Sequence, residues 1–155
     1  MSQDKKQGCL PLRAIRFAHD NKCFFMIVRA FFYSAFYRLG LLIFKPKRMK
    51  KNWGTEKEES SEEESMDGFD YVQKVARAVL CVCNYTKWES KCLVRALTAG
   101  KLLRKKKLHY TLYLGVCQED SGEMAAHAWL RWGKFIVTGK IDGLDRYAVV
   151  STFRN

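Results

Sequence analysis

Two residues, Cys92 and His127, have sequence surroundings that suit covalent acyl-transfer chemistry. Cys92 lies at the expected start of a helix, two residues after the candidate N-cap Ser90. Free N–H groups and the positive dipole end of a helix stabilise a thiolate, so a cysteine there can act as a nucleophile. His127 lies in the run AAHAW (125–129), where alanines leave room for a substrate beside the imidazole. A thiolate at a helix start facing a histidine on a neighbouring strand is typical of cysteine acyl-transfer enzymes.

Taken alone, Cys92 and His127 each have a simpler, structural interpretation. The motifs of nucleotide-binding and zinc sites are absent from the sequence. A single histidine can be a satisfied core residue, and a single cysteine can be a small buried hydrophobe. The chain has no GxxxxGK[ST], GxGxxG or HExxH sequence. Its six cysteines form no CxxC pair, which argues against structural zinc, and they are too sparse for a disulfide scaffold. No signal peptide is recognised, so we expect free thiols in the cytoplasm.

The predicted elements that would position Cys92 and His127 define an α+β fold. Apolar residues recur at helical spacing over Phe69–Cys83, and a second helix follows Cys92 and ends in the basic run 104–107. Four strand-like segments come next: Tyr110–Cys117, Met124–Trp132, Phe135–Thr138 and Tyr147–Phe153. A two-residue turn of type II′ is predicted at Gly133-Lys134. We therefore expect helices packed on an antiparallel sheet.

The segment Phe24–Phe44 is almost wholly apolar. Only Arg29 and Arg38 interrupt it, and nine residues place them about 180° apart on a helix, so the segment has no single polar face. One interpretation is a helix buried against the domain or a partner. The other is a membrane-associated helix, because its basic flank, residues 45–51, would attract anionic lipid.

Composition divides the 155 residues into three parts. Residues 1–53 hold the apolar helix and its basic flanks, residues 54–68 form an acidic linker, and residues 69–155 form the catalytic domain. The linker is rich in glutamate and serine, so we expect it to be solvated and crossed by few contacts. The 48% hydrophobic content excludes a disordered or fibrous protein, and the net charge of +12 favours anionic partners.

Several segments, in a fixed order, carry a resemblance to a known family. They are KCLVRAL (91–97), LL (102–103), LYLGV (112–116) and AHAWL (126–130). With them the chain resembles the lasso peptide biosynthesis B2 proteins, which are leader peptidases, over about Trp88 to Phe153. The resemblance implies a transglutaminase-like, papain-related cysteine protease fold in a bacterial cytoplasmic enzyme. It implies no metal and no organic cofactor.

The resemblance also implies roles for individual residues. Cys92 would be the nucleophile, and His127 the general base and acid. The third member in the family is an aspartate on the strand or turn after the histidine strand, but residues 133–139 contain no carboxylate. Asp142 is the first acid beyond them and is the predicted orienting residue, followed by Asp145.

Alternatives to an orienting aspartate stay open. If the hairpin closes at Gly133-Lys134, Thr138 pairs with Trp129 on the His127 face, and its hydroxyl could orient the ring. A backbone carbonyl could do the same, or a Cys–His dyad could act without a third residue. Trp88 is expected to pack, with the oxyanion region as its alternative place.

The implied function is removal of the leader from a lasso peptide precursor. No leader-recognition domain is recognised in the sequence, so the resemblance implies that a separate B1 leader-recognition protein delivers the precursor peptide. A lasso cyclase would receive the cleaved core. Contact of residues 24–44 and their basic flank with a membrane surface is one of the two open interpretations of this segment, and no nucleic-acid partner is expected of the peptidase. The alternative function is a non-catalytic basic adaptor that binds anionic lipid or nucleic acid, with Cys92 and His127 merely structural.

Overall fold

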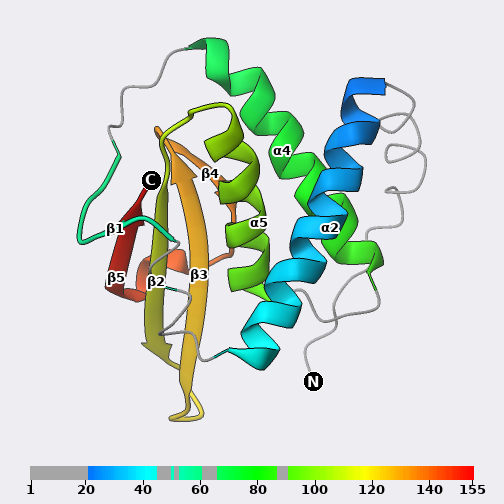
Figure 1. Cartoon of the computed structure of the whole chain (residues 1–155). Helices are drawn as coiled ribbons and strands as arrows, with labels where there is room; N and C mark the ends of the chain where they lie inside the picture. Colours follow the sequence, from blue (N-terminus) through cyan, green and yellow to red (C-terminus); the bar gives the residue numbers. More distant parts are fainter. Residues whose placement is uncertain (1–20, 45–49, 51–52, 61–65, 87–90) are drawn as a thin grey trace.

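The computed structural model describes residues 21–44, 50, 53–60, 66–86 and 91–155. Three helices lie on one side of a five-stranded sheet, which is the predicted α+β class (Figure 1). In chain order the elements are α2 (Asn21–Ile43), β1 (Thr55–Glu56), α4 (Met66–Tyr85), α5 (Cys92–Lys105), β2 (Thr111–Gln118), β3 (Met124–Trp132), β4 (Phe135–Thr138), the 3₁₀ turn η2 (Leu144–Arg146) and β5 (Ala148–Arg154).

The sheet has the order β1-β5-β2-β3-β4, and its neighbouring strands run antiparallel. The predicted turn at Gly133-Lys134 is confirmed, because Trp132 pairs with Phe135 and Gly133 has φ 52°. Only the first of these two turn residues has a positive φ, as a type II′ turn requires. The last strand, β5, lies between β1 and β2.

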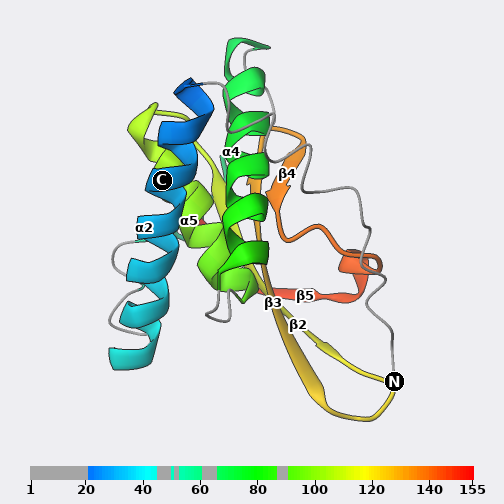
Figure 2. The same ribbon diagram turned by 90° about the vertical axis from the view of Figure 1, so that its right-hand side faces the viewer.

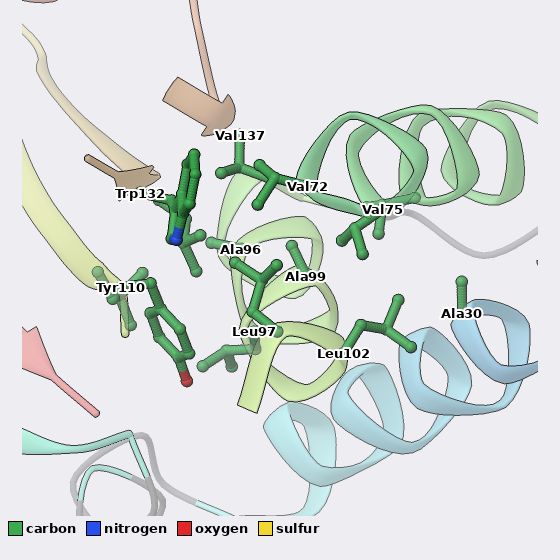
Figure 3. Packing of buried hydrophobic residues seen from close by; sticks show 14 of the residues in the cluster. Ala30, Val72, Val75, Ala96, Leu97, Ala99, Leu102, Tyr110, Trp132 and Val137 are labelled. Atoms are coloured by element: carbon green, nitrogen blue, oxygen red, sulfur yellow. The ribbon is translucent and has the colours of Figure 1, made fainter. Parts of the chain in front are cut away.

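The helices form two layers on the sheet. Helix α5 packs on β3 and β4, while α2 packs on α4 and α5 and lies farther from the sheet (Figures 1 and 2). A small residue lets α5 lie close to the Tyr110 ring, because a Cβ at Gly100 would lie 2.7 Å from that ring. Figure 3 shows Ala96 and Ala99 of α5 among the core side chains that join the sheet to α4 and α2.

The apolar segment is a helix with one buried side. Cys23, Ala30 and Ser34 are at most 2% exposed and face α4 and α5, whereas Phe25 and Phe32 are more than 60% exposed. The interpretation of a helix packed against the domain therefore holds for one side of α2. Its other side remains open to solvent among the described residues.

The expected solvated linker is corrected in the part that the structure describes. Thr55 and Glu56 form β1 on the edge of the sheet beside β5. Ser60 is 4% exposed, and its backbone N–H donates to the Thr111 hydroxyl at 2.7 Å. Arg131 of β3 contacts the Glu59 carboxylate at 3.1 Å. Acidic residues dock here because basic and hydroxyl groups of the sheet face them, which the composition of the segment alone could not reveal.

Candidate active site

Cys92 is the first residue of α5. Its N-cap is Lys91, with φ −60° and ψ 161°, and the lysine side chain caps no N–H group of the first turn. The expected N-cap Ser90 lies outside the described residues. The Arg95 N–H donates to the Lys91 carbonyl at 3.2 Å, so the N–H groups that precede Arg95 have no acceptor within the helix. This end of α5 therefore offers a positive dipole and backbone donors beside the Cys92 thiol.

His127 lies on β3, the strand on which α5 packs. Alternation along β3 puts Ala128 and Leu130 on the side of the helices, where Leu130 is fully buried. His127 and Trp129 project from the opposite side, with ring centroids 6.2 Å apart. Within the described part of the chain, no hydrogen bond joins His127 to Cys92. Such bonds are often long in a free enzyme and tighten when substrate binds.

The His127 ring is held by a backbone group. Its Nε2 atom lies 2.8 Å from the Gly139 carbonyl oxygen. A carbonyl oxygen only accepts hydrogen bonds, so Nε2 carries a proton and donates it to this bond. In the neutral ring, Nδ1 then keeps its lone pair and is the nitrogen that can accept a proton.

Tyr147 connects the two candidate residues. Its ring centroid lies 5.4 Å from that of His127. The pKa of the Tyr147 hydroxyl is raised, first by its hydrogen bond with Cys117 and by burial, and then by the negative charges of Cys117, Glu119 and Cys92. The tyrosine thus contacts the His127 ring, and Cys92 lies close enough to contribute to the Tyr147 pKa. No motif in the sequence singled out Tyr147, which immediately precedes β5.

Gly115 gives the LYLGV segment a role in the site. It pairs with His127 across the two strands. A Cβ at this position would lie 2.8 Å from the Trp129 ring and 3.1 Å from Cβ of Tyr147. The glycine therefore leaves the space in which the rings around His127 meet. It is a second site residue that sequence reasoning did not assign.

The predicted orienting residue Asp142 lies in the loop after β4. It lines a hollow of about 310 Å³ together with Cys117, Arg146 and Tyr147. No hydrogen bond among the described residues joins Asp142 or Asp145 to His127. The partner of His127 Nε2 is instead the Gly139 carbonyl, which matches the backbone-carbonyl alternative. A catalytic role of Asp142 stays a prediction.

Thr138 does not pair with Trp129 as predicted. A register shift between Leu130 and Arg131 pairs it with Leu130 instead. A shift by one residue moves a side chain to the other face of a sheet, so Thr138 shares the core side with Leu130. Its hydroxyl is buried without a hydrogen-bond partner in the described structure. The expectation that Thr138 lies on the His127 face is therefore wrong.

Two further expectations concern Trp88 and bound metals. Trp88 lies outside the described residues. Among the residues that the structure describes, no three His, Cys, Asp or Glu side chains gather so that they could hold a metal ion.

Comparison with known proteins gives one match. The sequence model of the transglutaminase-like superfamily matches residues 35–152. The chain belongs to the transglutaminase-like superfamily. No curated protein and no solved structure matches it. The superfamily match begins within α2 and continues through α4, α5 and most of the sheet, and it is consistent with a fold of the cysteine-protease type.

Proposed function

We propose that this protein is a cysteine peptidase that removes the leader from a lasso peptide precursor. The observation that carries the proposal is the position of Cys92 at the start of α5, the helix that packs on the His127 strand. Tyr147 supports it, because its ring lies 5.4 Å from that of His127 and Cys92 contributes to its raised pKa. Membership of the transglutaminase-like superfamily supports the general chemistry. The assignment to lasso peptide maturation rests on the resemblance of the sequence segments.

In the first half-reaction, the Cys92 thiolate attacks the carbonyl carbon at the leader–core junction. Backbone N–H groups in the first turn of α5 stabilise the oxyanion. His127, which took the thiol proton on Nδ1, returns it to the departing amine. The peptide C–N bond breaks, the core leaves with a free amine, and the leader remains on Cys92 as a thioester.

In the second half-reaction, water attacks the thioester. His127 takes a proton from the water through Nδ1. When the tetrahedral intermediate collapses, its C–S bond breaks and His127 returns that proton to the sulfur, which leaves the leader carboxylic acid and the Cys92 thiol. The Gly139 carbonyl holds Nε2 throughout and keeps the ring in the tautomer that accepts at Nδ1. Gly139 thereby takes the orienting role that was expected of Asp142.

The leader would bind at the part of the β5 edge that no strand among the described residues covers. β1 pairs with only the last part of this strand, at Phe153 and Arg154. Val149 and Val150 lie before that part and are at least 50% exposed. An extended peptide that added there as a strand would pass beside Tyr147, whose ring centroid lies 5.4 Å from that of His127. We propose that a separate B1 leader-recognition protein delivers the precursor and that a lasso cyclase receives the core.

The test is cleavage of the precursor peptide by the purified protein together with its B1 partner, followed by mass spectrometry. Cys92→Ala should abolish leader removal and leave the circular dichroism spectrum unchanged, because no other group can form the acyl-enzyme. Cys81→Ala is the matched control, since Cys81 lies on α4 and burial raises the pKa of its thiol. Full activity of Cys92→Ala would refute the proposal.

A further inference from the structure

The outward face of α2 is the most apolar exposed surface of the described molecule. Nine large apolar side chains on and directly after this helix are each at least 42% exposed: Phe24, Phe25, Phe31, Phe32, Phe36, Leu39, Leu42, Ile43 and Phe44. We call these nine residues the α2 outer face. Monomeric soluble proteins rarely expose so many large apolar side chains together, and such patches mark interaction sites.

The α2 outer face has helical spacing. Phe25, Phe32 and Phe36 follow one another at intervals of seven and four residues and are 61%, 64% and 66% exposed. Residues at these intervals lie on one side of a helix. These three aromatic side chains therefore share the exposed side of α2. Figure 2 shows that α2 lies on the outside of the helical layer, away from the sheet.

The opposite side of α2 is fixed to the domain. Its buried residues have the same spacing of seven and four, and each precedes one of the three exposed phenylalanines by two positions. They are Cys23, Ala30 and Ser34, which are 2%, 0% and 0% exposed. By length and composition the Cys23–Ile43 segment could cross a membrane, as many core helices and signal sequences also could. A spanning helix would have to leave its contacts with α4 and α5, so an orientation in the plane of an interface fits this packing better.

Several positive charges lie near α2. Arg29 is an exposed residue of α2. Lys105 Nζ lies 5.3 Å from the centre of the Tyr33 ring, and Lys106 Nζ lies 5.6 Å from that of Tyr71. Helix α2 contains no acidic residue, and in the sequence its end is followed by five basic residues within positions 45–51. Cations beside an apolar face complement the headgroups of an anionic bilayer.

We propose that the α2 outer face binds the surface of an anionic lipid membrane, with α2 lying in the plane of the interface. A second copy of the chain fits this face less well, because it would bring two identical positive rims together. His127 projects from the side of the sheet that faces away from the helices, so membrane binding through α2 would leave this side chain open to solvent. The proposal does not depend on the peptidase function.

The test is co-sedimentation of the full chain with phosphatidylcholine vesicles that contain or lack phosphatidylglycerol. We expect binding to the anionic vesicles, and roughly tenfold weaker binding to the neutral vesicles, since lysine and arginine side chains near the surface are attracted to anionic headgroups. The double variant Phe32→Ser/Phe36→Ser should bind the anionic vesicles roughly tenfold less or weaker still, because two large apolar groups no longer enter the bilayer.

Matched controls separate this surface from general stickiness and from misfolding. Met124→Ser/Val150→Ser also removes two exposed apolar side chains, 66% and 62% exposed, but from the sheet, and it should bind as the unchanged chain does. Circular dichroism should show that both double variants remain folded. Absence of binding to anionic vesicles, or equal binding by all variants, would overturn the proposal. The proposal would also be overturned if the chain bound no vesicles and light scattering showed a dimer that Phe32→Ser/Phe36→Ser converts to a monomer.

Discussion

At the scale of single residues, the contact that matters most for His127 is made by backbone. The Gly139 carbonyl 2.8 Å from Nε2 fixes the orientation and the tautomer of the ring. It carries only a partial charge, so it stabilises an imidazolium less than a carboxylate would. A site built in this way should tolerate the loss of nearby carboxylates.

The first prediction concerns those carboxylates. Asp142→Asn and Asp145→Asn should each retain more than about a tenth of the cleavage rate, a change below roughly 1.4 kcal/mol in the activation free energy. The measurement is the initial rate of leader removal. A serine triad that loses its aspartate is slowed roughly 10⁴-fold. A comparable loss of rate in Asp142→Asn, without one in Asp145→Asn, would show that Asp142 orients His127. Thr138→Val should also leave the rate nearly unchanged, because Thr138 lies on the core side.

The second prediction concerns Gly139. It has φ +83°, and a Cβ there would lie 2.5 Å from the Ala128 carbonyl oxygen and 2.8 Å from Cα of Trp129. Gly139→Ala should lower the free energy of unfolding by about 1–3 kcal/mol from backbone strain alone. It should also lower the cleavage rate, because the carbonyl that holds His127 must move.

Gly122 provides the matched control for Gly139. It has a similar φ of +84°, but a Cβ there would have no neighbour within 4 Å. Gly122→Ala should therefore lower the free energy of unfolding only through the strain of an alanine at positive φ, and it should keep full activity. Equal stability and equal activity of the two variants, measured by urea unfolding and by peptide cleavage, would mean that the close approach at Gly139 is unimportant.

At the scale of elements, α2 is an integral part of the helical layer. Its Tyr37 packs against the core. Burial and the nearby Tyr110 raise the pKa of Tyr37 from 10.0 to about 12, which the Arg104 charge partly opposes. The phenol is therefore held neutral in the folded protein over a pH range in which it ionises in the unfolded chain.

The third prediction follows from this difference in pKa. Between pH 10 and 12 the unfolded chain has lost the Tyr37 proton and the folded protein still holds it. The stabilising contribution of Tyr37 is thus fully present below pH 10 and is lost as the pH rises towards 12, at up to about 1.4 kcal/mol per pH unit. Urea unfolding at several alkaline pH values should show a shallower decline for Tyr37→Phe than for the unchanged chain. Tyr85→Phe, at a residue 59% exposed, should decline as the unchanged chain does.

At the scale of the whole molecule, the N-terminal helix and the catalytic unit share one core. Figure 3 shows Ala30 of α2 beside Val75 of α4 and Leu102 of α5, and all three residues are almost fully buried. This packing replaces the expectation that few contacts join the N-terminal segment to the rest. The start of the superfamily match, residue 35, agrees with it.

The fourth prediction is that the chain depends on α2 for stability. Deleting residues 1–52 would expose the surfaces of α4 and α5 that α2 covers, and the lost burial amounts to several kcal/mol. We expect a melting temperature at least about 10 °C lower, or loss of a cooperative transition, measured by circular dichroism. Ala30→Glu in the full chain should also lower the melting temperature, because it places a charge in the core. Phe36→Glu, on the exposed side of α2, should change the melting temperature little. An unchanged transition in the truncated chain would show that α2 is dispensable for folding.

Local sequence patterns were enough to predict the secondary structure and the candidate nucleophile and base. Turn chemistry and strand alternation are properties of neighbouring residues, so Met124–Trp132, Phe135–Thr138 and the turn between them were predicted with the bounds that the structure has. The two helices around Cys92 were found for the same reason, although their ends differ by two or three residues.

The surroundings of the candidate catalytic residues depend instead on contacts between segments that are far apart in the chain. Strand register depends on contacts between distant segments, and one bulge beside Leu130 moved Thr138 away from the His127 face and left the Gly139 carbonyl at Nε2. Tyr147 reaches the site because β5 lies beside β2, an order that no local pattern specifies. The outward face of α2 was equally hidden, because an apolar helix has no polar side to mark it and only packing determines which residues face solvent.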